Sequence, residues 1–209
     1  MNVLVVGATG PLGLAIVKEA QKAGHAVTAM IRSSQAQFSQ GVRTVRGDVL
    51  QPETLAQAVA GQDAVISSLG SKITFKRMTI LSEGTRNLAR AMRDANVDRF
   101  ICITGIGAGD SQGHGGFLYD NLIQPFLLND VYKDKTRQEQ VVRDSGLDWT
   151  IVRPAKLTNG APRGSGSYRV LSDLNGVTAA KISRADTAAF TVGLLNKSDL
   201  SRRTVLLTY

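Results

Sequence analysis

Residues 2–24 read NVLVVGATGPLGLAIVKEAQKAG, an apolar run that passes three glycines and continues as a helical pattern. The apolar residues 3–6 predict a buried strand, and apolar residues recur at helical spacing over residues 12–23. A helix that begins directly after a strand presents unpaired backbone N–H groups and the positive end of its dipole. Such a turn binds phosphate groups where its backbone can approach them closely.

The three glycines have separate expected roles. Gly7 permits a tight turn, Gly10 leaves room for the phosphates, and Gly13 lets the helix pack closely on the strand. Glycines at this spacing also occur in ordinary strand–helix turns, but their place in the first strand–helix unit favours a dinucleotide cofactor. The predicted pyrophosphate loop consists of Gly7, Thr9, Gly10, Pro11, Leu12 and Gly13.

The rest of the chain alternates strands and helices. Strand-like runs end near Val6, Met30, Val45, Leu69, Thr104 and Val152, and helical patterns cover residues 12–23, 52–60, 78–96, 133–145 and 185–195. The strands read as continuous apolar runs, which is typical of parallel strands buried on both faces. The sequence therefore predicts one α/β domain over residues 1–209, a Rossmann-type doubly wound parallel sheet with helices on both faces.

Composition narrows the classes of partner. Hydrophobic residues make up 43% of the 209 residues, and the apolar runs are far shorter than the roughly 20 residues of a membrane span. No secretion-signal pattern opens the sequence, and the single cysteine cannot form a disulfide framework, so we expect a cytoplasmic protein.

The net charge of +8 is scattered along the chain, which favours a phosphorylated small molecule over nucleic acid as the binding partner. We expect no metal site, and either a monomer or a weak homodimer.

The end of the second predicted strand indicates which nicotinamide cofactor is bound. Sites for NAD commonly carry an acidic residue here, whereas this chain has Arg32 followed by Ser33. A guanidinium can grip the 2′-phosphate of NADP(H) in a fork, and a hydroxyl can add a donor. The alternative is that Arg32 is only an exposed loop arginine.

Two further strand ends are expected at the same edge of the sheet. Asp48 follows the third strand, where its carboxylate could accept from an adenine amino group while Val49 packs on the ring. Asp48 could equally cap the short helix that follows. Leu69 and Gly70 close the fourth strand and complete the predicted cofactor residues on this side.

The Gly-rich stretch at residues 105–116 follows the fifth strand and should border the substrate. Residues 105–125 and 155–180 are the expected substrate-side loops, with Ile106, Phe117 and Tyr119 in the predicted substrate pocket. The two aromatic rings could stack on a flat substrate or close a small core. His114 lies in the same stretch, either as a proton donor or as an ordinary loop residue.

The motifs GATGPLG, IRSS, GDV, SSLG, SEGTRNLARAM and SGLDWTIVRP together resemble the atypical short-chain dehydrogenase/reductase family. Within that family the chain is similar to the subgroup of biliverdin reductase B (flavin reductase) and the NmrA-like proteins. The resemblance covers nearly all residues and implies an NADP(H)-binding protein. Many members reduce flavins, quinones or tetrapyrroles, so it also implies a small-molecule acceptor that is aromatic or conjugated.

The family's usual catalytic groups are a Ser or Thr whose hydroxyl polarises the substrate, a Tyr that donates the proton, and a Lys four residues after the Tyr. The resemblance places Thr104 and Lys135 in the first and last roles, near the nicotinamide ribose, and Pro154 beside the nicotinamide, although Pro154 also simply ends a strand. The residue four before Lys135 is Val131, and Tyr132 is one position out of register. Without the full triad, a flavin or tetrapyrrole can still take its proton from solvent or at a ring nitrogen.

Three functions remain open from the sequence. The first is hydride transfer from NADPH to a planar conjugated acceptor. The second is a non-catalytic NmrA-like sensor that binds NADP(H), which the missing tyrosine favours. The third is an epimerase of nucleotide-linked sugars, although too few residues follow residue 156 for a sugar-nucleotide domain. Fold alone does not separate an enzyme from a sensor.

Overall fold

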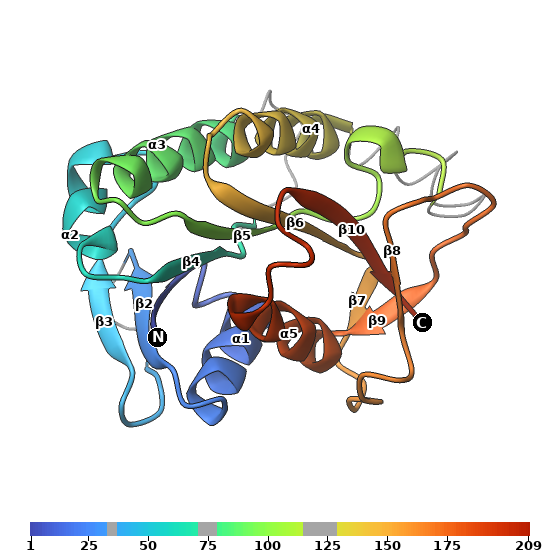
Figure 1. Ribbon diagram of the computed structural model, residues 1–209, viewed down its shortest axis with the longest axis horizontal. Coiled ribbons are helices and arrows are strands. Elements are labelled where there is room, and N and C mark those ends of the chain that lie inside the picture. Colours follow the sequence, from blue (N-terminus) through green and yellow to red (C-terminus); the bar gives the residue numbers. More distant parts are fainter. Residues whose placement is uncertain (33–36, 71–78, 115–128) are drawn as a thin grey trace.

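A mostly parallel sheet of eight strands forms the centre of the protein (Figure 1). The computed structural model describes residues 1–32, 37–70, 79–114 and 129–209. The strand order is β3-β2-β1-β4-β5-β6-β10-β8. The strands are β1 (Asn2–Val6), β2 (Ala26–Ile31), β3 (Arg43–Arg46), β4 (Ala64–Ser67), β5 (Arg99–Ile103), β6 (Asp148–Pro154), β8 (Arg169–Leu171) and β10 (Arg203–Thr208).

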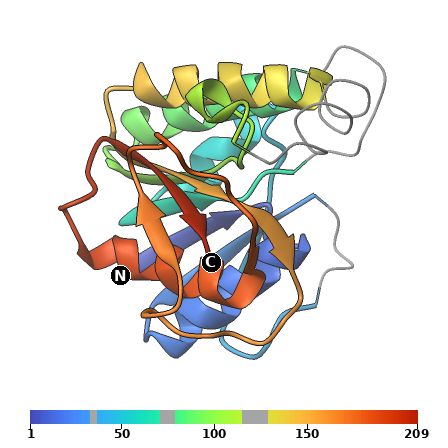
Figure 2. The ribbon, with the colours of Figure 1, turned by 90° about the vertical axis from the view of Figure 1, so that its right-hand side faces the viewer.

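Helices cover both faces of the sheet. In Figure 1, α3 and α4 lie above the sheet and α1 and α5 below it, and Figure 2 shows the same layers from the side. The helices are α1 (Pro11–Lys22), α2 (Leu55–Val59), α3 (Ile80–Asp94), α4 (Asn129–Arg143) and α5 (Arg184–Gly193), with short 3-10 turns η1 (Pro52–Thr54), η2 (Gly109–Ser111) and η4 (Leu194–Asn196). The predicted doubly wound architecture is confirmed.

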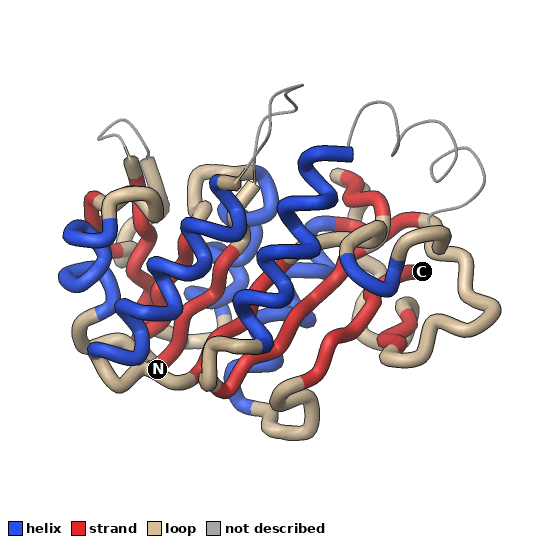
Figure 3. The backbone as a smooth tube through the Cα atoms, turned by 90° about the horizontal axis from the view of Figure 1, so that it is seen from above, coloured by secondary structure: helices blue, strands red, loops and turns tan. Residues whose placement is uncertain are grey.

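Two apolar clusters, one on each face, hold the layers together. Ile16 and Val192 belong to the cluster that α1 and α5 bury, and Leu88 and Met92 to the cluster under α3. Figure 3, viewed from above, shows the helices of one face lying over the strands and running roughly alongside them. Each fully buried side chain of this size contributes about 1.5–3 kcal/mol to folding. Because helices cover both faces of the sheet, the side chains on both faces of a central strand are mostly apolar. All five residues of β5, for example, are buried.

The direction of winding reverses at β1. From β1 the chain proceeds to β2 and β3 on one side and later to β4, β5 and β6 on the other. The crossovers that leave β1 and β4 therefore diverge at the carboxyl ends of these strands, which is where open α/β sheets bind ligands. The glycine loop after β1 lies at this switch point.

The end of the chain contains strands that the sequence did not indicate. β8 pairs antiparallel with β10, and β7 (Lys156–Thr158) and β9 (Lys181–Ser183) form a separate two-stranded parallel sheet. Each of the three spans only three residues, too few for a period to show. The expected substrate-side loop at residues 155–180 thus contains β7 and β8, and the loop at 105–125 contains η2 up to the last described residue before the gap, His114.

Candidate functional site

A cavity of about 710 Å³ opens at the carboxyl ends of the parallel strands. Its volume lies within the range of small-molecule sites. It brings together most of the residues predicted to bind the cofactor: Gly7, Thr9, Gly10, Pro11, Leu12, Gly13, Arg32, Asp48, Val49, Leu69, Gly70, Thr104, Lys135 and Pro154. Ser33, Phe117 and Tyr119 lie outside the described residues. Ile106 is buried in the core cluster beside α1 and α5, and it is not among the described residues that line the cavity.

The glycine loop has the tight geometry that its spacing indicates. Gly7 has a φ of +76°, and a Cβ there would lie 2.6 Å from the carbonyl oxygen of Ser68. A Cβ on Gly13 would lie only 2.1 Å from the carbonyl oxygen of Gly7, so helix α1 could not approach β1 with any larger residue. At Gly10 the nearest atom would be 3.4 Å away, which leaves the cavity side open.

The N-terminus of α1 is available to bind an anion. Its N-cap residue, Gly10, provides no side-chain hydrogen bond to the first turn, and Pro11 occupies the first helical position. The unpaired N–H groups of the first turn and the positive end of the helix dipole therefore border the cavity. These residues fit the diphosphate of a dinucleotide cofactor.

Arg32 and Asp48 lie at the β2–β3 side of the cavity. Arg32 is exposed at the end of β2, with its side chain on the cavity wall. Asp48 is half-buried, and its Oδ1 accepts from the backbone N of Leu50 at 3.0 Å. The carboxylate therefore stabilises its own turn, while η1 begins after Gln51 without a side-chain cap. Val49 is buried and forms part of the wall.

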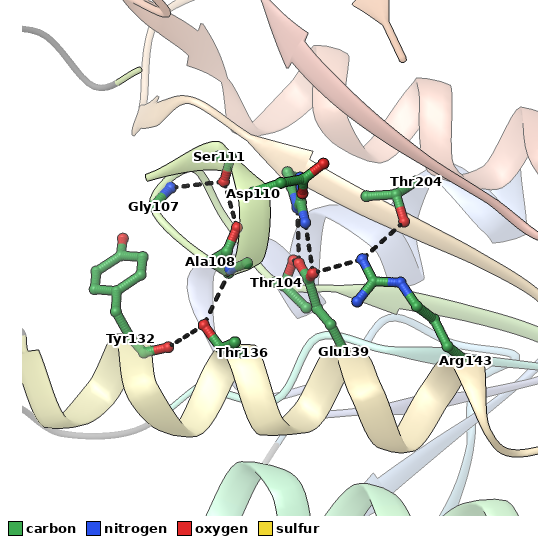
Figure 4. Close-up of polar contacts among 12 residues, drawn as sticks. Thr104, Gly107, Ala108, Asp110, Ser111, Tyr132, Thr136, Glu139, Arg143 and Thr204 are labelled. Atoms are coloured by element: carbon green, nitrogen blue, oxygen red, sulfur yellow. Dashed lines mark hydrogen bonds and ion pairs between the residues drawn. The ribbon is translucent and has the colours of Figure 1, made fainter. Parts of the chain in front are cut away.

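Thr104 is held by a carboxylate that the sequence did not single out. Its Oγ1 donates to Oε1 of Glu139 at 2.8 Å, and both side chains are buried (Figure 4). A threonine hydroxyl has one proton, so Thr104 cannot donate to Glu139 and to a substrate at once. The expected role of Thr104 as a donor that polarises the substrate is therefore not available in this arrangement, although Thr104 does line the cavity.

Lys135 reaches the cavity from α4. Its Nζ donates to the carbonyl oxygen of Thr104 at 2.5 Å, which fixes the ammonium beside the end of β5. Burial lowers the pKa of Lys135 to about 8, and the negative charge of Glu139 opposes that shift. A cation with a pKa near neutrality responds to small changes in its surroundings, as groups at functional sites often do.

Tyr132 stays on the same side of α4 as Lys135. The Lys135 Nζ lies 5.2 Å from the centroid of the Tyr132 ring, so the ammonium meets the face of the ring. A Cβ on Gly105 would lie 3.0 Å from Lys135 Nζ and 3.9 Å from the Tyr132 hydroxyl. The hydroxyl is thus near the end of β5, but Tyr132 is not among the described residues that line the cavity.

An ionic network centred on the buried pair Arg153 and Glu139 lies next to Thr104 (Figure 4). The guanidinium of Arg153 donates to both carboxylate oxygens of Glu139 and also pairs with Asp110 of η2 at 2.6 Å. Arg143 donates to Glu139 Oε2 at 3.0 Å. Burial alone would lower the pKa of Arg153, but the bonds to Glu139 and Asp110 outweigh it and raise that pKa above its ordinary value.

The candidate residue His114 and the single cysteine, Cys102, both have structural roles. His114 Nδ1 lies 2.8 Å from the carbonyl oxygen of Val177, a contact that joins the η2 loop to the segment before β9. His114 is not among the described residues at the cavity wall. Cys102 is fully buried, and burial raises the pKa of its thiol, which keeps it protonated and unreactive.

The cavity also contains residues that sequence reasoning missed. Arg184 lies at the start of α5 and Leu157 in β7, and both line the cavity beside Pro154. Their positions depend on the pairing of β7 with β9, which leaves no local pattern. Within the four described ranges, no cluster of metal-binding side chains occurs and no helix is both long and apolar enough to cross a membrane.

A glycine loop at the switch point of a doubly wound sheet, with a helix N-terminus open to a large cavity, defines a dinucleotide-binding protein. The sequence profile of the NAD(P)H-binding family matches residues 7–198, and the chain belongs to that family.

The chain is also similar to individual proteins. The chain is 28% identical to an uncharacterized sugar epimerase, YhfK, of Bacillus subtilis, over 100% of the chain and 94% of that protein. It is 30% identical to an NAD(P)H azoreductase of Xenophilus azovorans over 73% of the chain, but spans only 47% of that longer protein. Among solved structures it shares its fold with ChuY, an anaerobillin reductase from Escherichia coli O157:H7, with a TM-score of 0.84 and 24% identity, covering 100% of this chain and 97% of that one.

Proposed function

We propose that the protein is an NADPH-dependent oxidoreductase that transfers a hydride to a planar conjugated acceptor, such as a flavin, a quinone or a biliverdin-like tetrapyrrole. The observation that carries this proposal is the composition of one cavity. The same cavity is lined by the glycine loop at one point, by Arg32 at another, and by Thr104, Lys135 and Pro154 at a third. Membership of the NAD(P)H-binding family and similarity to an azoreductase support it.

The preference for NADPH rests on Arg32. The sequence after β2, RSSQA at residues 32–36, contains no acidic residue that could accept from a ribose hydroxyl, and the exposed guanidinium of Arg32 has the donors that a 2′-phosphate requires. The first turn of α1 binds the diphosphate through backbone N–H groups. Asp48 and Val49, which line the cavity on the β3 side, would flank the adenine, and Leu69 and Gly70 would border the middle of the cofactor.

At the reacting end, the protein positions NADPH and the acceptor and supplies a positive charge, and it does not itself donate the proton. Bound NADPH supplies the hydride. Lys135 places a positive charge at the end of β5, and its bond to the carbonyl of Thr104 sets that charge in place. Because the Thr104 hydroxyl donates its hydrogen bond to Glu139 and not to the acceptor, the acceptor takes its proton from solvent or at a ring nitrogen. This requirement favours conjugated acceptors over simple carbonyl compounds.

The second candidate is a non-catalytic sensor of NADP(H) similar to the NmrA-like proteins. Two observations favour the sensor. The hydroxyl of Thr104 already donates its hydrogen bond to Glu139, and Tyr132 is not among the described residues that line the cavity. Both functions use the same cofactor site, so cofactor binding does not distinguish them.

The test is NADPH consumption, followed by absorbance, with FMN, a simple quinone and biliverdin as separate acceptors. Binding of NADPH is measured in parallel by calorimetry. Binding with turnover of at least one acceptor is the expected result. Binding without turnover of any acceptor would favour the sensor, and failure to bind NADPH would contradict both functions.

A further inference from the structure

Arg184 lies at the far end of the cavity from Arg32. It is the first residue of α5, directly after β9, and it shares the wall with Leu157 of β7 and Pro154 at the end of β6. The sheet order separates β2 from β6 by four strand spacings, or roughly 19 Å. The two arginines therefore serve opposite ends of one cavity, and Arg184 lies where the acceptor, not the adenosine, is expected.

The charge of Arg184 has no acidic partner in the described part of the chain. Its side chain is half-buried, and its Nη1 donates to Oδ1 of Asn159 at 2.7 Å. That bond orients the guanidinium and uses one of its five N–H donors. Arg153, in contrast, is neutralised by two carboxylates. Because Asn159 is a neutral amide, the guanidinium of Arg184 keeps its positive charge, and its remaining N–H donors can bind a ligand.

The surroundings of Arg184 add an apolar surface to this charge. Leu157 and Pro154 offer aliphatic carbon atoms on the same wall. A ligand that matches them has a flat apolar body with an anionic group at one side. Arginine suits such a group because its planar fork binds carboxylate and phosphate oxygens in pairs.

We propose that Arg184 selects acceptors that carry a peripheral oxyanion, a carboxylate or a phosphate, by binding that group at the end of the cavity. This inference rests on the proposed reductase function, whose acceptor class it narrows. Arg184 acts here as a specificity residue and takes no part in hydride transfer.

The test compares matched acceptors with and without the anion. FMN and riboflavin differ by a phosphate, and biliverdin and its dimethyl ester differ by their carboxylates. In the parent protein we expect FMN over riboflavin, biliverdin over its ester, or both. In Arg184→Ala the KM of the favoured anionic acceptor should rise about tenfold or more, because a charge-assisted hydrogen bond is lost, with little change for its neutral counterpart.

Two variants make the result specific. Arg184→Lys keeps the charge but loses the fork, so it should recover only part of the discrimination. Lys181→Ala removes an exposed charge from the neighbouring β9, and Lys181 is not among the described cavity residues, so its acceptor preference should match the parent. NADPH affinity should stay within about twofold in all three variants.

Equilibrium binding of the four acceptors, measured by fluorescence quenching in the presence of NADP⁺, separates this inference from the proposed function. Anion-dependent binding that Arg184→Ala abolishes, with no turnover, would overturn the reductase and support the anion site. Equal binding of each matched pair by the parent protein, or binding of none, would overturn the anion site. A loss of NADPH affinity in Arg184→Ala with unchanged acceptor preference would also overturn it, because Arg184 would then serve the cofactor.

Discussion

Arg153 and Glu139 form a bidentate ion pair inside the protein, with Nε to Oε1 at 2.8 Å and Nη2 to Oε2 at 2.6 Å. The arginine is 2% exposed and the glutamate 0%. The pair joins β6 to α4 next to two residues that line the cavity, Thr104 and Pro154. Because Glu139 also accepts from Thr104, the position of the β5 end depends on this carboxylate.

Replacing Glu139 with Ala should reduce the free energy of unfolding by about 3–5 kcal/mol, because it leaves the buried charge of Arg153 with only its exposed partner. Denaturant unfolding followed by circular dichroism measures the loss. The control is Asp110→Asn, which removes the partner whose side chain is 78% exposed and should cost at most about 1 kcal/mol. Equal losses in the two variants would contradict this assignment.

Gly13→Ala should destabilise the protein by about 1–3 kcal/mol, since the new methyl group would overlap the carbonyl oxygen of Gly7 and push α1 away from β1. Thermal unfolding gives the change. Gly10→Ala is the matched control: its methyl group has space within the fold but projects at the cavity wall. We expect Gly10→Ala to keep its stability and to lose affinity for NADPH. A stable Gly13→Ala variant would refute the close-packing role.

Arg32→Ala should weaken NADPH binding by about 1–3 kcal/mol, the range for hydrogen bonds to a charged group. Binding of NADH should change little, because it lacks the 2′-phosphate. Calorimetric titration of both cofactors into parent and variant provides the comparison. If the parent binds NADPH and NADH alike, or the variant loses both equally, Arg32 does not determine the cofactor preference.

Affinity for NADPH should decrease as the pH rises through about 8, where Lys135 loses its proton and its attraction for the anionic cofactor. The decrease should be roughly tenfold, as expected for one charge-assisted contact. Lys135→Met should bind more weakly at neutral pH and show a flat profile over the same range. An unchanged pH profile in Lys135→Met would assign the titration to another group.

The same residue should affect stability. The pKa of Lys135 is about 8 in the folded protein and 10.5 ordinarily, so unfolding takes up a proton between these values. The contribution of Lys135 to stability is therefore greatest above pH 10.5 and is lost as the pH falls through 8. Denaturant midpoints of parent and Lys135→Met, compared at pH 7 and pH 10, check the sign.

Tyr132→Phe should retain turnover to within about tenfold, because Lys135 meets the face of the Tyr132 ring and conjugated acceptors need no phenolic proton. A general acid contributes on the order of a hundredfold or more, so steady-state kinetics separate the two cases. A loss of that size, with NADPH affinity unchanged, would establish Tyr132 as the proton donor despite its register.

Local sequence patterns predicted much of this fold. The order of strands and helices along the chain up to β6 follows from apolar runs and helical spacing, which depend on neighbouring residues alone. The three-residue strands β7, β8 and β9 did not show, because their pairing is set by partners 25 or more residues away. Tyr132 shows that an exact spacing motif is too strict a test: residues three and four positions before Lys135 both lie on the same side of a helix as Lys135.

The sequence by itself was enough to predict the glycine loop, the candidate cofactor-binding residues at the strand ends and the arginine after β2. Each of these features is encoded within a few consecutive residues. Only the tertiary structure decided how the reacting end is arranged. Glu139 accepts a hydrogen bond from Thr104 because α4 packs against the ends of β5 and β6, and Arg184 lines the cavity because β9 pairs with β7. These contacts join residues from separate elements, and no local pattern specifies which elements will meet.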